Sequence, residues 1–372
     1  MRNRLYLLGI IITLAALMVG PSTYCQIIYG QPTSAQLQMI FTGWSLDFGD
    51  STIDVNQVMI PLSGFIPLGK NLDANYYLAN SSNKLNEPTS NADLSGLSDF
   101  SIQVNHAFRD DAFLVSGGIN LPTGKKKLSL SDEWPVLQFL SRDFLAFPMS
   151  RFGEGFGLNL LFGAARMVGQ FKCRGGISYQ LTGSYTPIAD GPKYNPGDLF
   201  SLNAGAELQK KHSKLNADLL GTLYTPDKLG GGKSFKQGSQ LDLRLSGQYG
   251  KKWYNLAAGI RYLIRGRNTD YGLNESVVEQ LKIYGNEFGV SGAVSLLFNE
   301  WTFTPMAEAR LIAKNETGLG NSKVYGVGGT LDKSLGANTI FGFGFEYLSG
   351  KADASRISLT GYSLTSHLTA GF

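Results

Sequence analysis

The chain has 372 residues, only 17% of them charged, and a formal net charge of +4. A charge this small and this dispersed argues against a nucleic-acid partner. Length alone would suggest two domains, but closed β structures can run long as single units. Glycine accounts for 46 residues and aromatic residues for 12% of the chain. After residue 25 no apolar run reaches the ~20 residues that a membrane-spanning helix needs.

The first 25 residues have the layout of a secretory signal peptide. A basic start at residues 2–4 precedes an apolar run, Leu5 to Val19, that is too short to cross a bilayer comfortably. Thr23 and Cys25 supply small residues at positions minus three and minus one, so we expect cleavage after Cys25. The alternative is a lipoprotein with its lipid on Cys25, which the bulky Tyr24 disfavours.

A period-two alternation of apolar and polar residues dominates the chain from about residue 36 to its end. Leu241, Leu243 and Leu245 fall on one face of an expected strand, whereas Asp242 and Arg244 fall on the other. A strand between lipid and a wet lumen requires this pattern. We therefore expect a signal peptide over 1–25, a short segment over 26–35, and over 36–372 an all-β domain, a transmembrane antiparallel up-and-down β-barrel.

Strand and loop lengths separate a membrane barrel from a soluble β-sandwich. The expected strands have ~10 residues or more, as tilted membrane strands need, where soluble strands usually have about 5 or 6. Tight turns alternate with longer connections, of which 122–153 is the longest, and this alternation is typical of outer-membrane barrels. We expect about sixteen strands, with fourteen as the alternative because a turn at Gly49-Asp50 would be a very short outer loop. The expected strands are 36–48, 52–65, 70–81, 98–108, 112–121, 155–166, 170–183, 199–209, 214–225, 237–249, 252–264, 282–298, 301–314, 322–332, 338–348 and 355–372.

The last expected strand carries a localisation signal. Its apolar face includes Tyr362, Leu364, Leu368 and the terminal Phe372. A terminal aromatic residue that closes such an alternation resembles the signal by which outer-membrane barrels are recognised for assembly. We expect a protein of the bacterial outer membrane with both termini in the periplasm, in contact with outer-membrane lipid and, during folding, with the barrel-assembly machinery.

No catalytic, cofactor or metal motif is recognisable. His106, His212 and His367 are scattered, and no nucleophile with an acidic or amide partner accompanies them at a recognisable spacing. The stretch Gly118 to Lys126 has the wrong spacing for a phosphate-binding loop, and the glycines at 153–157 lack the dinucleotide spacing. We therefore expect no enzyme, no cofactor and no metal.

The inward faces of the expected strands carry charges of both signs, which indicates a hydrated interior. A barrel of sixteen strands leaves room for an aqueous channel. The charges could select solutes, or they could only pair across the lumen and keep it folded and wet. The expected lumen-lining residues are Glu207, Asp218, Asp242, Arg244, Arg261, Glu308, Arg310 and Glu346.

The connection 122–153 is more apolar than an exposed loop should be. Helical spacing of its apolar residues predicts a short amphipathic helix from Pro135 to Phe147. Such an element must bury its apolar face. It could cap the mouth and collect hydrophobic ligands, or it could rest on the barrel wall or the membrane interface. The candidate ligand-contact residues are Trp134, Leu137, Phe139, Leu140, Phe144 and Phe147.

Four short motifs resemble the outer-membrane family named for the phenol meta-degradation pathway. They are 96–99, which opens an expected strand, the hairpin end at 116–124, the glycines at 155–157, and 194–198. The resemblance covers about 50–372 in order. It implies kinship with the fatty-acid-uptake channels and, as for that family, passage of hydrophobic or aromatic compounds. The chain departs from those channels in its charged lumen and in the expected absence of a long N-terminal hatch.

Together these features predict a passive outer-membrane transport protein for small hydrophobic compounds. The loop 122–153 would make first contact with the small-molecule substrate, and the charged lumen would be its path. The alternative is a structural or adhesive barrel that conducts nothing, and a barrel hydrolase is the third possibility.

Overall fold

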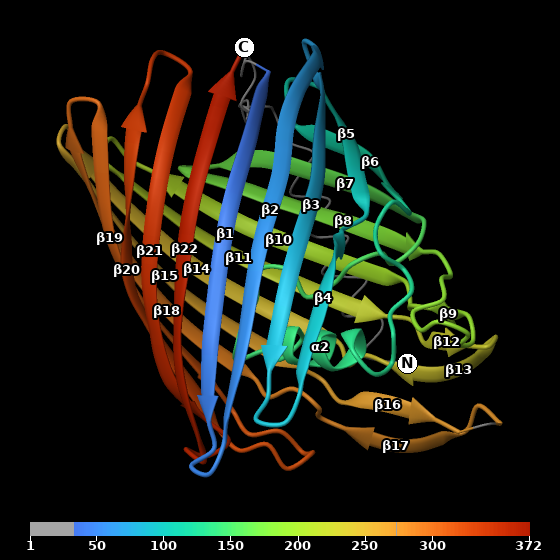
Figure 1. The fold of residues 1–372 in the computed structure, drawn as a ribbon. Helices are drawn as coiled ribbons and strands as arrows, with labels where there is room; N and C mark the ends of the chain where they lie inside the picture. The colour runs from blue at the N-terminus through green and yellow to red at the C-terminus, as the bar shows by residue number, and fades with distance from the viewer. Residues whose placement is uncertain (1–32, 273) are drawn as a thin grey trace.

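The computed structural model describes residues 33–272 and 274–372 (Figure 1). The expected signal peptide and residues 26–32 lie outside the described residues. One helix, α2 (Glu133–Leu140), accompanies the strands of the described ranges. The strands are β1 (Ser34–Asp47), β2 (Thr52–Gly69), β3 (Leu72–Asn86), β4 (Asn91–Leu97), β5 (Phe100–Phe108), β6 (Phe113–Leu121), β7 (Gly157–Val168), β8 (Phe171–Thr182), β9 (Tyr194–Asn195), β10 (Leu199–Gln209), β11 (Ser213–Tyr224), β12 (Asp227–Leu229), β13 (Gly232–Lys236), β14 (Gln240–Lys251), β15 (Tyr254–Arg265), β16 (Asn268–Tyr271), β17 (Val277–Leu281), β18 (Glu287–Phe298), β19 (Trp301–Ile312), β20 (Ser322–Ser334), β21 (Thr339–Ala352) and β22 (Ile357–Gly371).

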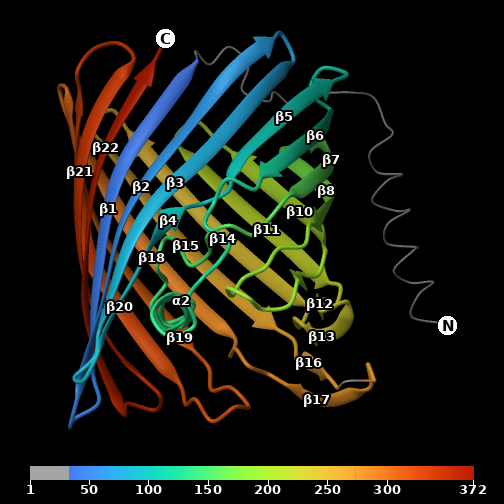
Figure 2. The same ribbon diagram turned by 45° about the vertical axis from the view of Figure 1, so that its right-hand side comes forward.

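Within the described residues, seventeen strands form one antiparallel sheet that closes because β22 pairs with β1 (Figures 1 and 2). Two of them, β4 and β5, share one position in the ring, since β3 pairs with β5 over 72–77 and with β4 over 80–86. The ring therefore has sixteen positions, which confirms the expected all-β barrel of sixteen strands. Closure pairs the backbone groups for which lipid offers no hydrogen-bond partner.

The turn at Gly49-Asp50 connects two paired strands, β1 and β2, so the expected count of sixteen holds and the fourteen-strand alternative does not. One segment differs from the sequence-based expectation. Residues 81–98, expected as a long loop, form instead the far ends of β3 and β4. Their outward residues are polar because this end of the barrel extends beyond the apolar band, so the alternation that marks a membrane strand is absent there.

Three of the long connections also contain strands. The strands β9, β12, β13, β16 and β17 form a second, five-stranded sheet at the end of the barrel opposite the C-terminus (Figure 1). No helix in the described ranges is long and apolar enough to cross a membrane.

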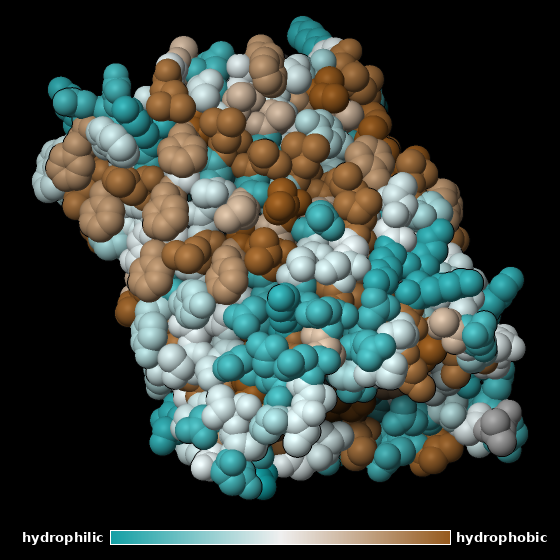
Figure 3. Space-filling view, in the orientation of Figure 1, coloured by the Kyte–Doolittle hydropathy of each residue, from teal (hydrophilic) through white to brown (hydrophobic). Residues whose placement is uncertain are grey.

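The outer face of the ring carries the apolar residues that the alternation predicts. Leu243 and Leu245 of β14 are exposed on it, whereas Asp242 of the same strand is buried on the inner face. Figure 3 shows apolar side chains gathered over the upper part of the face seen in Figure 1, and hydrophilic side chains below them. On β22, Tyr362 belongs to this outer face and stacks on Phe41 at 5.3 Å between ring centroids. Whether Tyr362, Leu364, Leu368 and Phe372 serve as an assembly signal stays a prediction.

Opposite faces of one strand should respond differently to the same charge. Leu245 lies on the outer face in the middle of β14, and Ser246 lies inside. We expect Leu245→Arg to lower the free energy of unfolding in lipid vesicles by about 2–4 kcal/mol, because it places a cation in hydrocarbon. The control Ser246→Arg, which adds the same group to a hydrated lumen, should cost much less. Equal losses in urea titrations of the two variants would contradict this assignment of faces.

Candidate functional site: an inner loop and a charged wall

The connection between β6 and β7 folds into the barrel. We call residues 122–153 the inner loop. Figure 2 shows its helix α2 inside the ring of strands, and α2 packs against β2, β3 and β4. The helix is shorter than the expected 135–147, because the chain turns at Ser141 and the remaining apolar residues follow as irregular backbone.

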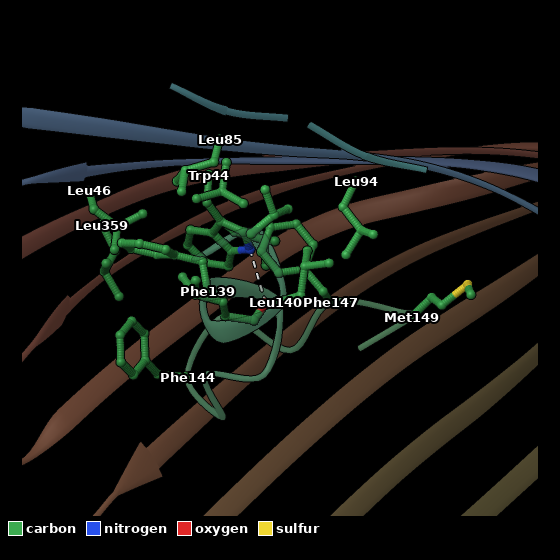
Figure 4. Close-up of a cluster of buried hydrophobic side chains, with 14 of the residues drawn as sticks. Trp44, Leu46, Leu85, Leu94, Phe139, Leu140, Phe144, Phe147, Met149 and Leu359 are labelled. Atoms are coloured by element: carbon green, nitrogen blue, oxygen red, sulfur yellow. Dashed lines mark hydrogen bonds between the residues drawn. The ribbon is translucent and has the colours of Figure 1, made fainter. Parts of the chain in front are cut away.

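The apolar side of the inner loop is buried against an apolar sector of the inner wall (Figure 4). Of the six candidate ligand-contact residues, Leu140 and Phe144 are each 1% exposed, Phe139 and Phe147 are also buried, and Trp134 and Leu137 are only partly buried. The wall residues come from both ends of the chain, chiefly from β1 to β4 and from β20 to β22. They are Trp44, Leu46, Val55, Met59, Ala79, Leu85, Leu94, Val324, Leu348, Ala352, Ile357 and Leu359, together with Ile312 at the end of β19.

The two ends of the inner loop cross at the junction between β4 and β5. A Cβ on Gly124 would lie 2.8 Å from the Cα of Gly153, and a Cβ on Gly153 would lie 2.7 Å from the carbonyl carbon of Gly124. This close approach accounts for both glycines of the stretches that had invited comparison with nucleotide-binding loops. The Asp99 carboxylate accepts hydrogen bonds from the backbone N–H groups of Gly124 at 2.9 Å and Glu154 at 2.7 Å. It thereby holds both ends of the loop at one point.

Buried hydrogen bonds fix the inner loop to β1 and β2. The indole Nε1 of Trp44 donates to the carbonyl oxygen of Leu145 at 2.9 Å. The Gln57 side chain donates to the carbonyl oxygen of Met149 at 2.7 Å and accepts from its N–H at 3.0 Å. Gln57 is fully buried and also donates to the side chain of Asn83 at 2.7 Å. A buried polar group without a hydrogen-bond partner is unfavourable, so these bonds favour a single docked position of the loop.

The same loop reaches the opposite side of the ring. The Arg310 guanidinium on β19 donates to the carbonyl oxygen of Phe144 at 3.1 Å. Arg265 on β15 lies 3.4 Å from the Asp143 carboxylate and 3.3 Å from that of Glu287 on β18. Burial raises the pKa of Asp143 above its usual range, although Arg265 and Arg310 oppose the shift and Glu287 adds to it. The inner loop therefore contacts two walls, through Trp44 and Gln57 on one side and through Arg265 and Arg310 on the other.

The charged residues predicted for the lumen lie on the inner face, and most of them form ion pairs along the wall. Asp242 contacts Arg244 at 2.6 Å and Arg261 at 2.9 Å, all on the neighbouring strands β14 and β15. Further along, Glu308 lies 3.7 Å from Arg310. The unpredicted Arg174 of β8 contacts Asp218 and lies 3.8 Å from Glu207. These pairs join side chains on the same strand, on neighbouring strands or, for Arg174 and Asp218, on strands separated only by β10, and none of them reaches across the lumen. A role in selectivity stays a prediction.

Space remains in front of this wall, which we call the charged wall (the inward side chains from β8 to β19). Two adjoining hollows of about 350 and 360 Å³ lie there. The first is lined by Arg244, Arg261 and Glu308, among others, and the second also reaches Glu346 on β21. The Arg244 side chain is 56% exposed although it points inward. The lumen therefore combines a charged side bordered by open space with an apolar loop on the other side.

The three histidines stand apart from this arrangement. His367 faces Asp332 at 3.4 Å, His106 Nδ1 lies 3.1 Å from the Asn71 carbonyl oxygen, and the His212 ring packs on Tyr249. In the part of the chain that the structure describes, none of them contacts a hydroxyl or thiol that could act as a nucleophile. The same ranges hold no group of three His, Cys, Asp or Glu residues placed to bind a metal.

Sequence reasoning missed the residues that seat the inner loop. Trp44, Gln57 and Asp143 carry no motif, and Arg265 stands at the end of its strand. Of these four residues, only Arg265 could have been predicted to face the lumen, because the alternation of β15 places it on the same face as Arg261.

No family model and no curated protein matches the chain. Among solved structures, it is similar to a Pseudomonas aeruginosa FadL homologue at 7% identity and a TM-score of 0.47, over 92% of this chain and 90% of that one. It is similar to the CymD monoaromatic hydrocarbon channel at 12% identity and 0.46, over 92% and 89% of the two chains. For Pseudomonas aeruginosa OprD the values are 10% and 0.44, over 95% and 100%. Identities and scores at this level do not bear on substrate.

Removing the two hydrogen bonds between the Gln57 side chain and the Met149 backbone should loosen the inner loop. Gln57→Leu leaves both backbone groups of Met149 without their partner, at about 1–3 kcal/mol for each buried group. We expect faster trypsin cleavage at Arg142 in the folded barrel. The control Gln248→Leu changes an exposed side chain that makes none of the loop's hydrogen bonds. Unchanged cleavage in Gln57→Leu would show that the Gln57 hydrogen bonds do not hold the loop.

Docking of the inner loop should depend on pH through Asp143. Because burial raises its pKa above the usual value of about 3.9, the docked loop favours the protonated carboxyl. Docking is therefore strongest at low pH and weakens as the pH rises through the raised pKa. Hydrogen-exchange protection of residues 133–149 should fall in the native protein relative to Asp143→Asn between pH 4 and pH 8. A constant ratio of protection between the two proteins would rule out this linkage.

Proposed function

We propose that the chain is a passive transport protein of the bacterial outer membrane, with both termini in the periplasm, that admits small hydrophobic compounds. The inner loop would be their contact surface and the charged wall would border their path. One observation carries the proposal, namely that an apolar element is held inside the barrel and faces a hydrated wall.

The two surfaces suit solutes that are largely apolar. Contact with the loop would stabilise a bound solute by about 25 cal/mol for each Å² of apolar surface removed from water. The charged wall would keep water in the remaining space. Trp134 and Leu137 are the partly exposed members of the contact set. They are the residues that a solute could touch while the loop stays docked. Contact with the buried members, such as Phe144, would need movement of the loop.

A structural barrel without a conducted substrate is the second candidate. It is supported by the fixation of the inner loop to both walls, through Trp44 and Gln57 on one side and Arg265 and Arg310 on the other. A loop seated in this way can act as a permanent brace. The histidine contacts do not favour the third candidate, a barrel hydrolase.

Ion current through the purified full chain in planar bilayers separates these functions. We expect the native protein to conduct, and phenol, used as a small soluble aromatic probe, to reduce that current. Trp134→Ser combined with Leu137→Ser should raise the phenol concentration for half block about tenfold, which corresponds to about 1.4 kcal/mol of lost contact. Leu130→Ser is the matched control, since Leu130 is 63% exposed on the same loop and lies outside the apolar cluster.

Deletion of residues 134–147 provides the second arm of this experiment. If neither the native chain nor the deletion variant conducts any solute, the transport function is wrong and the structural barrel is favoured. If the deletion conducts and phenol blocks it as well as it blocks the native protein, the inner loop is not the contact surface.

A further inference from the structure

A hollow of about 560 Å³ lies on the outer face of the barrel, at the end opposite the C-terminus. The strand register places five of its lining residues in one row across the neighbouring strands β15, β18, β19, β20 and β21, with each residue opposite the next. In order they are Tyr262, Phe288, Leu311, Lys323 and Lys351. The row changes from apolar to basic within the hollow.

The apolar part of the row belongs to the membrane-facing surface. Tyr262, Phe288 and Leu311 are among the exposed large apolar residues of the outer face. Aromatic residues at the edge of the apolar band mark the boundary between lipid and water in such barrels. Whatever occupies this part of the hollow must therefore be compatible with an acyl chain.

The basic part of the row is a pair of like charges. Lys323 and Lys351 are direct cross-strand partners and both are exposed. Like charges directly opposite each other are destabilising, and neither lysine has a carboxylate partner among the described residues. An anion between the two ammonium groups would relieve the repulsion and could accept a charge-assisted hydrogen bond from each.

Two turns that are bonded to each other form the rim above the lysines. The N–H of Gly320 donates to the Asp353 carboxylate at 2.7 Å, and the N–H of Ala354 donates to the carbonyl oxygen of Asn321 at 2.8 Å. The Asp353 N–H in turn donates to Ser322 Oγ at 3.3 Å. These hydrogen bonds hold the two turns together, so the rim is in place before a ligand binds.

We propose that this hollow binds a phosphorylated membrane lipid. The phosphate lies between Lys323 and Lys351, and an acyl chain lies over Leu311 and Phe288. A lipid meets both requirements of the row with one molecule, and it already surrounds this face of the barrel at high concentration. With both termini in the periplasm, as proposed above, the lipid belongs to the outer leaflet.

The test uses the full chain folded in dodecyl maltoside micelles, with lipid binding followed by native mass spectrometry. Dioctanoyl phosphatidic acid is the probe, because it combines a phosphate monoester with short chains. We expect the double variant Lys323→Gln, Lys351→Gln to bind it at least tenfold more weakly than the native chain. The control Lys251→Gln, Lys333→Gln removes two lysines that lie over Tyr249 and Trp301 at the other end of the barrel. It should bind the probe as the native chain does.

Two further probes decide between the parts of the ligand. Inorganic phosphate supplies the anion without chains, and dioctanoylglycerol supplies the chains without the anion. Both should bind at least tenfold more weakly than phosphatidic acid. Equal losses in the two double variants would show a non-specific charge effect and overturn the site. Equal affinity for inorganic phosphate or for dioctanoylglycerol would overturn the lipid in favour of a simple ion site or a simple apolar groove.

Discussion

The packing of the inner loop on the apolar sector of the wall is the interaction on which the rest of this structure depends. In a water-filled barrel, Trp44, Leu359 and Val324 would face water from the inside, which is unfavourable by about 25 cal/mol for each Å² of apolar surface. The inner loop brings a matching apolar face, including Phe144 and Leu140, and removes both surfaces from water together. Without the loop the apolar sector would face water, and without the sector the apolar side of the loop would do the same.

This packing also explains why the lumen is asymmetric. The loop covers the sector from β20 through β1 to β4, and the arginine–carboxylate pairs of the wall lie on the uncovered strands from β8 to β19. Asp143 and Phe144 meet that charged wall near the ends of β15 and β19, through Arg265 and Arg310. The crossing of Gly124 and Gly153 at the junction of β4 and β5 sets the point from which the loop enters.

The ring could be predicted from the sequence because the signal is local. Residues that face lipid are apolar and residues that face the lumen are polar, so neighbours such as Leu245 and Ser246 alternate along each strand. Sequence reasoning missed the far ends of β3 and β4, where both faces are polar or covered and the contrast disappears. The apolar spacing of the inner loop indicated burial but overestimated the helix, because Phe144 and Phe147 are buried from irregular backbone. The seat of the loop was not predictable, since Trp44 and Leu145 are 101 residues apart and no local pattern joins them.

The pairing of the lumenal charges limits what the charged wall can contribute to selection. Asp242 is shared by Arg244 and Arg261, and Arg174 lies between Glu207 and Asp218. Alternating charges on adjacent strands largely cancel a few ångströms from the wall, whereas a strong steering field needs one sign of charge over an extended surface. We therefore expect the wall to favour neither sign of solute. Within the proposed function, discrimination among solutes then falls to the shape and the apolar surface of the inner loop.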